Sequence, residues 1–307
     1  MEKREAIARY EQATALLPGR WQRLATQLPD EQKAEAEELR LRVGFPVTVL
    51  LPEGEIRLAQ ETPRALVSQA DLEQLCDTVT GYSRYAAADS ISRGFLTAQG
   101  GFRIGLCGTA VLQKGVCSNL RDFSSAVIRI SRERPGIADD LLPQLTEEGR
   151  LCGTLILSPP GLGKTTLLRD LIRAVSDGTE WLPAHRVAVA DERGEIAVMH
   201  RGQPQMRVGC HTDVLDACPK AVAIPMLLRS ANPQVIAVDE ITAPEDLRAM
   251  ELAANCGVTL LATIHAAGRD DLDRKPLYEP LARTGIFRRC VTISVVDGQR
   301  HYAVTTL

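Results

Sequence analysis

The sequence predicts an α/β protein in which a mostly parallel sheet is preceded by a smaller α+β N-terminal domain. In the second part, short apolar runs alternate with helical patterns, which is typical of parallel strands joined by right-handed crossovers. The first part contains helical segments and strand-like runs without that alternation. A chain of 307 residues is long enough for two ordinary domains, which we expect over residues 1–148 and 149–307.

The expected N-terminal domain begins with charged helices rich in alanine and leucine between residues 3 and 40. Apolar and basic residues then alternate over 39–43, which predicts a half-buried strand. Residues 47–51 and 55–58 flank a Pro-Glu-Gly turn and predict a hairpin. The remaining expected elements are a helix over 68–80 and strands over 102–106, 110–112 and 126–130.

Prolines and glycines between residues 133 and 150 predict a linker to the second domain. Apolar runs in that domain predict its strands. They lie at 155–157, 187–190, 235–238, 258–263, 291–296 and 301–305. The last two strands are joined at Asp297-Gly298, a favoured hairpin turn.

A glycine-rich loop follows the first strand of the second domain and leads into a helical pattern. Strand, glycine-rich loop and helix form the context that a phosphate-binding P-loop requires, and this context argues against an incidental turn. The residues expected to contact a nucleotide are Ser158, Pro159, Pro160, Gly161, Leu162, Gly163, Lys164, Thr165 and Thr166.

Each part of this loop has a predicted task. Gly161 and Gly163 allow the backbone to turn its N–H groups toward a triphosphate. Lys164 can reach the β- and γ-phosphates, and the Thr165 hydroxyl can complete the ligand shell of Mg²⁺. Ser158 departs from the usual pattern, which has glycine six residues before the lysine.

Two acids end the buried run of residues 235–238. In P-loop enzymes the first acid at such a strand end supports Mg²⁺, and the second can activate the attacking water. We therefore assign the magnesium role to Asp239 and the general-base role to Glu240. The alternative is that the two acids only solvate the end of the strand.

A second acidic strand end follows residues 187–190. Its side chains are expected at the carboxyl edge of the sheet, where ligands bind in open α/β folds. Glu192 or Glu195 is predicted to help hold metal or water, and Glu192 is the next candidate for the base. The alternative is an exposed acidic loop solvated by Asp191 and Arg193.

Thr263 and His265 end another buried strand toward the same edge. Such a polar pair can sense the γ-phosphate by hydrogen bonding and relay its loss to a neighbouring segment. A single histidine at a strand end is more often an ordinary surface or core residue, but the neighbouring motifs favour the sensor role for His265.

Four arginines are candidates for neutralising charge in the transition state, within the subunit or across an interface. The sequence does not choose among them. They are Arg193, Arg201, Arg207 and Arg229.

Composition argues against several other classes of protein. A net charge of −3, the lack of a Lys/Arg run and an aromatic content of 4% disfavour nucleic acid as a partner. Eight scattered cysteines without a C-x-x-C pair predict neither zinc nor a disulfide framework. No run approaches about 18 apolar residues, so we expect no direct membrane insertion. A charged N-terminus predicts a cytoplasmic protein that reaches a membrane only through partners.

The order of these motifs resembles the secretion-type ATPases of type II and type IV pilus systems. It is still more similar to the stage III sporulation protein AA family of endospore-forming bacteria. The matching segments are 158–170, 191–195, 212–216, 228–241 and 263–266, with 38–44 and 100–108 in the first part. One departure is Cys210-His211, where the resemblance leads us to expect proline and arginine before Thr212-Asp213.

The resemblance implies a RecA-like P-loop core that uses ATP and Mg²⁺ in the mother-cell cytoplasm. It also implies a homo-oligomer, typically a hexameric ring with nucleotide at subunit boundaries. The implied partners are membrane-embedded sporulation channel proteins, and the implied task is to energise a secretion-like channel between mother cell and forespore. Two alternatives remain: a nucleic-acid motor, and an assembly scaffold that binds ATP with little turnover. Glu240 argues against the scaffold, which needs no base.

Overall fold

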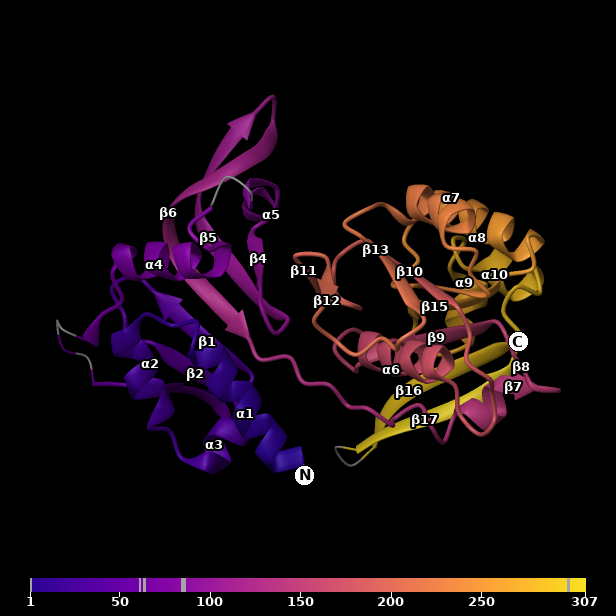
Figure 1. Cartoon of the computed structure of the whole chain (residues 1–307), viewed down its shortest axis with the longest axis horizontal. Coiled ribbons are helices and arrows are strands. Elements are labelled where there is room, and N and C mark those ends of the chain that lie inside the picture. Colours follow the sequence, from indigo (N-terminus) through magenta and orange to yellow (C-terminus); the bar gives the residue numbers. More distant parts are fainter. Residues whose placement is uncertain (1, 61, 63–64, 84–86, 297–298) are drawn as a thin grey trace. The chain divides into compact units, whose positions relative to one another are not determined.

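The computed structural model describes residues 2–60, 62, 65–83, 87–296 and 299–307, and the chain forms two compact units (Figure 1). The first unit ends at Arg132 and the second is Glu133–Leu307, whereas we expected the boundary between residues 148 and 149. No helix within the described ranges has the length and apolar character needed to cross a membrane.

The segment that we expected as a linker belongs to the second unit. Leu142 and Leu145 are buried in the same hydrophobic cluster as Leu171 of the helix that follows the P-loop. The carboxylate of Asp170, on that helix, accepts hydrogen bonds at 2.9 Å from the backbone N–H groups of Gly136 and Ala138. Because of these contacts, the prolines and glycines of residues 133–150 lie within the second unit and do not mark the boundary between the units.

The first unit is a six-stranded antiparallel sheet in the order β3-β2-β1-β6-β5-β4 with helices packed against it. Its helices are α1 (Glu2–Thr14), α2 (Gly19–Thr26), α3 (Asp30–Glu35), α4 (Gln69–Thr80) and α5 (Ala88–Ser92). Its strands are β1 (Glu38–Arg42), β2 (Thr48–Leu51), β3 (Gly54–Arg57), β4 (Phe95–Ala98), β5 (Phe102–Gln113) and β6 (Val116–Arg129).

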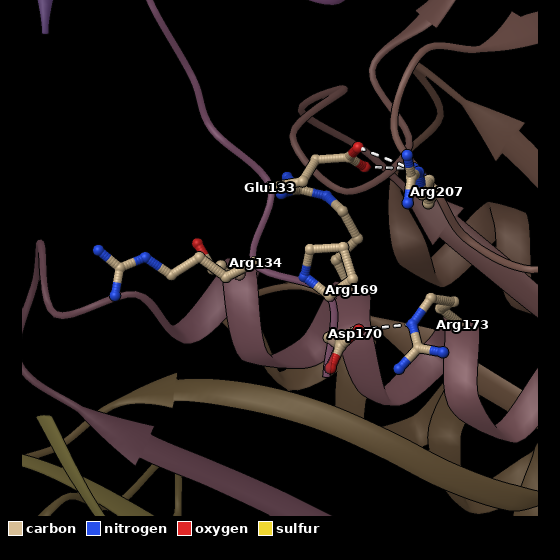
Figure 2. Close-up of a pocket in the computed structure, with 8 residues that line it drawn as sticks. Glu133, Arg134, Arg169, Asp170, Arg173 and Arg207 are labelled. Atoms are coloured by element: carbon tan, nitrogen blue, oxygen red, sulfur yellow. Dashed lines mark hydrogen bonds and ion pairs between the residues drawn. The ribbon is translucent and has the colours of Figure 1, made fainter. Parts of the chain in front are cut away.

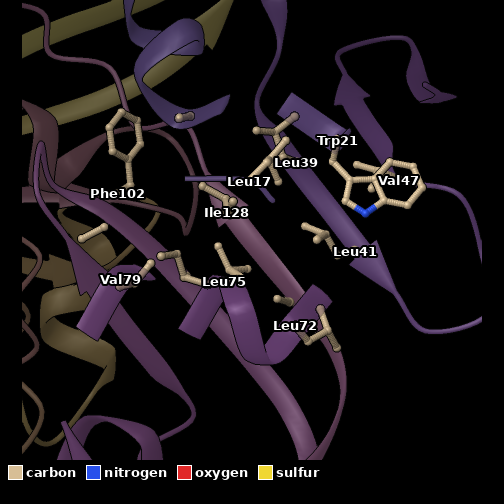
Figure 3. Close-up of a cluster of buried hydrophobic side chains, with 14 of the residues drawn as sticks. Leu17, Trp21, Leu39, Leu41, Val47, Leu72, Leu75, Val79, Phe102 and Ile128 are labelled. Atoms are coloured by element: carbon tan, nitrogen blue, oxygen red, sulfur yellow. The ribbon is translucent and has the colours of Figure 1, made fainter. Parts of the chain in front are cut away.

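The alternating pattern of β1 buries Leu39 and Leu41 on one face of this sheet, as predicted for a half-buried strand. Trp21 of α2 and Leu72 of α4 lie in the same cluster (Figure 3). The predicted strands at 102–106 and 110–112 form one strand, β5. Its pairing with β6 shifts register between Cys107 and Thr109, which is where the sequence pattern breaks.

The second unit has a seven-stranded sheet in the order β13-β10-β14-β15-β9-β16-β17. All neighbours are parallel except β16 and β17. The strands of this sheet are β9 (Thr154–Ser158), β10 (Val187–Asp191), β13 (Thr212–Asp216), β14 (Val235–Val238), β15 (Thr259–His265), β16 (Arg289–Val296) and β17 (Gln299–Thr306). The predicted turn at Asp297-Gly298 lies outside the described residues.

Helices cover both faces of this sheet. On one face α6 (Lys164–Asp177) packs on alternate strand residues such as Ile156 and Val189. On the other, α7 (Lys220–Ser230) and α8 (Pro244–Asn255) pack on Leu155 and Ile236. The smaller elements are the 3-10 helix η2 (Leu142–Leu145), β7 (Thr146–Glu147), β8 (Arg150–Leu151), β11 (Met199–His200), β12 (Gln203–Pro204), α9 (Asp270–Arg274) and α10 (Glu279–Arg283). The fold class predicted from the sequence is confirmed.

Candidate nucleotide-binding site

The glycine-rich loop joins β9 to α6, in the predicted order of strand, loop and helix. Gly161 has φ +81° and Gly163 has φ +97°, a backbone region that residues with a side chain rarely adopt. Ser158 is the buried last residue of β9, and its hydroxyl donates to Pro159 O at 2.7 Å. A strand residue needs no positive φ, so serine fits where the usual pattern has glycine.

The ammonium group of Lys164 uses all three of its hydrogen-bond directions inside the site. It donates to Ser158 O at 3.3 Å, to Pro159 O at 3.5 Å and to Nδ1 of His265 at 2.8 Å. Burial lowers the pKa of Lys164, while the carboxylates of Glu240 and Asp239 act in the opposite direction. A buried cation at the start of a helix is arranged to receive an anion.

Sheet register brings the histidine to this lysine. His265 of β15 pairs with Ser158 of β9, so its side chain lies beside the loop. Nε2 of His265 is 3.0 Å from a carboxylate oxygen of Glu240. Because an ammonium can only donate and a carboxylate can only accept, a neutral His265 with its proton on Nε2 satisfies both partners. Lys164, His265 and Glu240 therefore form one chain of hydrogen bonds.

Asp239 follows β14 directly and faces the first turn of α6. Its carboxylate accepts from the Thr165 hydroxyl at 3.2 Å and from the Thr263 hydroxyl at 2.8 Å. The backbone N–H of Glu240 donates to Asp239 at 3.0 Å. The Thr165 hydroxyl and the Asp239 carboxylate offer adjacent oxygen ligands of the kind that Mg²⁺ takes together with substrate phosphates.

The second carboxylate of the pair is held on two sides. One oxygen of Glu240 contacts His265, and the other is 3.1 Å from Nη1 of Arg193. The Glu240 side chain is 20% exposed, so it retains access to solvent. Of the four arginine candidates, Arg193 is the one whose guanidinium contacts a candidate catalytic group. Arg207 pairs with Glu133, and Arg201 and Arg229 are exposed.

The acidic loop after β10 is organised around a buried carboxylate rather than a solvated one. Asp191 is fully buried and accepts from the backbone N–H groups of Glu195, Ile196 and Ala197. Burial raises the pKa of Asp191, and these hydrogen bonds act against the rise. Glu192 also lies at this sheet edge, but its carboxylate is 2.6 Å from the buried ammonium of Lys220.

A hollow lies beside Thr166, on the first turn of α6, and is shown in Figure 2. Its charged groups are largely engaged with one another. Arg173 pairs with Asp170 at 2.6 Å, and Arg207 binds the Glu133 carboxylate. The other lining residues are Arg134, Pro135 and Arg169.

Cys210-His211, the pair that departs from the family resemblance, lies at the C-terminal end of α6. Nδ1 of His211 is 2.8 Å from Ser176 O, and its backbone N–H donates to the Ser176 hydroxyl. Ser176 is in the last turn of α6, whereas Lys164 begins it. In this structure His211 is therefore placed to hold the helix end rather than to contact the P-loop.

Comparison with known proteins shows the family of this chain. A family model described as "Sporulation stage III, protein AA" matches residues 7–301. The "Stage III sporulation protein AA" of Bacillus subtilis (strain 168) is 37% identical over 284 residues, covering 92% of this chain and 90% of that protein. The chain belongs to the stage III sporulation protein AA family. The family resemblance inferred from the motifs is thus confirmed.

Two solved structures of other proteins are similar in fold to this family member. The X-ray structure of the Legionella pneumophila ATPase DotB has a TM-score of 0.57 and 18% identity, over 90% of this chain and 77% of that one. The crystal structure of the pilus retraction motor PilT with bound ADP gives a TM-score of 0.57 and 18% identity, over 89% and 79%. The chain therefore shares the RecA-like α/β fold of these two structures.

Three residues of this family member that bear on the site were missed by sequence reasoning. Asp191 was assigned a part only in the alternative of an exposed, solvated loop, although it directly ends a buried strand, which was an available signal. No residue pattern near Lys220 indicates its ion pair with Glu192. Likewise, no pattern near Arg300 indicates its hydrogen bond to Leu162 O at 2.9 Å. Both contacts join segments that are distant in sequence, and only the sheet order brings them together.

Proposed function

We propose that this chain is a Mg²⁺-dependent ATPase that works as the motor of a sporulation channel complex. One observation carries the proposal: at one edge of the sheet, the P-loop residues Lys164 and Thr165 are in contact with the acid-terminated strand and with His265. Phosphate binding, metal binding and water activation each have a candidate group within this single network.

The hydrogen bonds of Lys164 give a physical route from binding to activation. Its three donors are occupied, so a phosphate oxygen must replace at least one acceptor. The neutral His265 ring competes poorly with a phosphate for an ammonium. When Lys164 turns to the phosphate, Nδ1 of His265 is released, and the imidazole is free to report the presence of the phosphate.

Glu240 is the proposed general base. It is positioned by His265 and by Arg193, and its backbone N–H is fixed by Asp239 and Thr263. To accept a proton from water it must give up one of its two side-chain partners. We propose that Arg193 leaves Glu240 and turns toward the phosphate, where a cation can neutralise developing charge.

The metal site is proposed at Thr165 and Asp239, whose oxygens hydrogen-bond each other. A bound Mg²⁺ supplies charge neutralisation on the phosphates. Glu192 is proposed to have a supporting role only, because its carboxylate is committed to Lys220, which is buried at the start of α7.

The cellular role rests on the family. The stage III sporulation protein AA relative, and the fold shared with the ATPase DotB and the pilus retraction motor PilT, support a motor in the mother-cell cytoplasm, docked on membrane-embedded channel proteins. We propose that it works as a homo-oligomer, with ATP at subunit boundaries. The second candidate is an assembly scaffold with little turnover. It is favoured only by the hydrogen bonds that link Lys164, His265 and Glu240, because these bonds occupy both the ammonium and the proposed base.

Oligomer formation is tested by measuring phosphate release from ATP across a range of protein concentrations, with light scattering on the same samples. We expect specific activity to rise as subunits associate, because a neighbouring subunit completes the site. Single- or double-stranded nucleic acid should leave the rate unchanged. Activity that stays flat across the monomer-to-oligomer transition contradicts a shared site, and stimulation by nucleic acid contradicts the proposed role.

A further inference from the structure

Arg300 of β17 reaches the P-loop from the far side of β9. Its Nε donates to the Leu162 carbonyl at 2.9 Å, and a Cβ built on Gly163 would lie 3.5 Å from that nitrogen. In the sheet order, β14 and β15, which carry the metal and base candidates, lie on one side of β9, whereas β16 and β17 lie on the other. The loop is thus contacted from both sides.

The placement of this arginine is electrostatically costly without an anion. The first N–H groups of a helix carry partial positive charge, so a cation near a helix N-terminus is unfavourable. Gly163 is the N-cap of α6 and provides no side-chain cap, and Lys164 adds a full positive charge. Among the described residues, Arg300 has the Leu162 carbonyl as its partner and no carboxylate at ion-pair distance.

We propose that Arg300 is a second phosphate-binding cation of the site, directed at the nucleoside end of the polyphosphate. This inference rests on the proposed function. A polyphosphate neutralises the helix N-terminus, Lys164 and Arg300 together, which turns an unfavourable cluster of charge into a favourable one.

The direction follows from the contacts of neighbouring loop residues. Lys164 and Thr165 bind His265 and Asp239, which mark the γ-phosphate end. Arg300 lies on the opposite side, near Thr166, whose Cβ would be 3.9 Å from a Cβ at Gly163 and which lines the hollow in Figure 2. Arg300 should therefore bind groups that ADP and ATP share, and it should leave the chemistry at the γ-phosphate unaffected.

The test measures the affinity of the full-length chain for ADP and for ATP by calorimetry with Mg²⁺, and kcat at saturating ATP. We expect Arg300→Ala to weaken both affinities alike, by about tenfold or more, the range of a hydrogen bond to a charged group. We expect kcat to stay within about twofold. Arg300→Lys keeps the charge and should retain most of the affinity. Arg300→Gln keeps a donor for Leu162 O but no charge, and should resemble the alanine variant.

Arg269→Ala is the matched control. Like Arg300, Arg269 is exposed and donates a hydrogen bond to a backbone carbonyl at 2.9 Å. Its acceptor is Thr306 O in β17, which lies away from the loop. Its removal should leave both affinities unchanged. Parental affinities in Arg300→Ala, or rescue by glutamine equal to that by lysine, overturn the proposal while the proposed function stands. A parent chain that binds neither nucleotide overturns both.

Discussion

Replacing Lys164 by alanine is expected to abolish tight ATP binding and to leave the fold intact. Its ammonium makes hydrogen bonds in the site that a phosphate would take over, and two lost charge-assisted hydrogen bonds correspond to about 100-fold or more in affinity. Burial lowers the pKa of Lys164, so keeping this charge in the folded chain costs free energy, and we expect its removal to leave the fold stable. Calorimetry measures the affinity, and thermal unfolding measures the fold.

Lys3→Ala is a suitable control for this variant. Lys3 is exposed, and its ion pair with Glu31 lies at the surface of the first unit. We expect it to bind ATP like the parent chain. If Lys164→Ala also binds like the parent, the loop is not a phosphate site, and the account of Lys164 is wrong.

Replacing Glu240 by glutamine is expected to keep ATP binding and to lower turnover by about 100-fold or more, the usual contribution of a general base. The amide oxygen can still accept the hydrogen bond from Nε2 of His265, whereas the contact with Arg193 is lost because an amide NH2 group cannot accept a hydrogen bond. It cannot take a proton from water. Phosphate release at saturating ATP measures the turnover, with binding measured on the same preparation.

The comparison with Glu192→Gln makes this test specific. Glu192 forms an ion pair with the buried Lys220, and its removal leaves that lysine with Asp246 at 3.8 Å. We expect this variant to lose stability more than turnover, because a buried ammonium that loses its nearest carboxylate is costly. Parental turnover in Glu240→Gln together with lost turnover in Glu192→Gln would move the base to Glu192.

The parts of the candidate site that could be predicted are those formed by residues that are contiguous in the sequence. The run before Asp239 is apolar throughout because β14 is buried on both faces, so the strand and its acidic end were visible in the sequence. The same reasoning located Lys164, Thr165 and His265. β13 was missed because it is the edge strand of the sheet, and its half-exposed sequence lacks a continuous apolar run.

Interactions between distant segments could not be predicted in this way. The sequence contains no sign that His265 lies between Lys164 and Glu240, because that contact depends on the register of β15 with β9. The commitment of Glu192 to Lys220 is equally non-local, which is why the sequence left two carboxylates open as bases. The observed boundary between the units differs from the expected one for the same reason. Residues 133–145 have the composition of a linker, and the sequence does not show that their leucines pack on α6.

The most direct test of the central claim is the number of phosphates released per chain when purified protein is mixed with excess Mg²⁺ and ATP. We predict continuous release well beyond one phosphate per chain. Lys164→Ala should show none, and Glu240→Gln should bind ATP with release reduced about 100-fold. Tight ATP binding by the parent chain with release that stops at or below one phosphate per chain would contradict a motor and would identify the protein as a nucleotide-dependent scaffold.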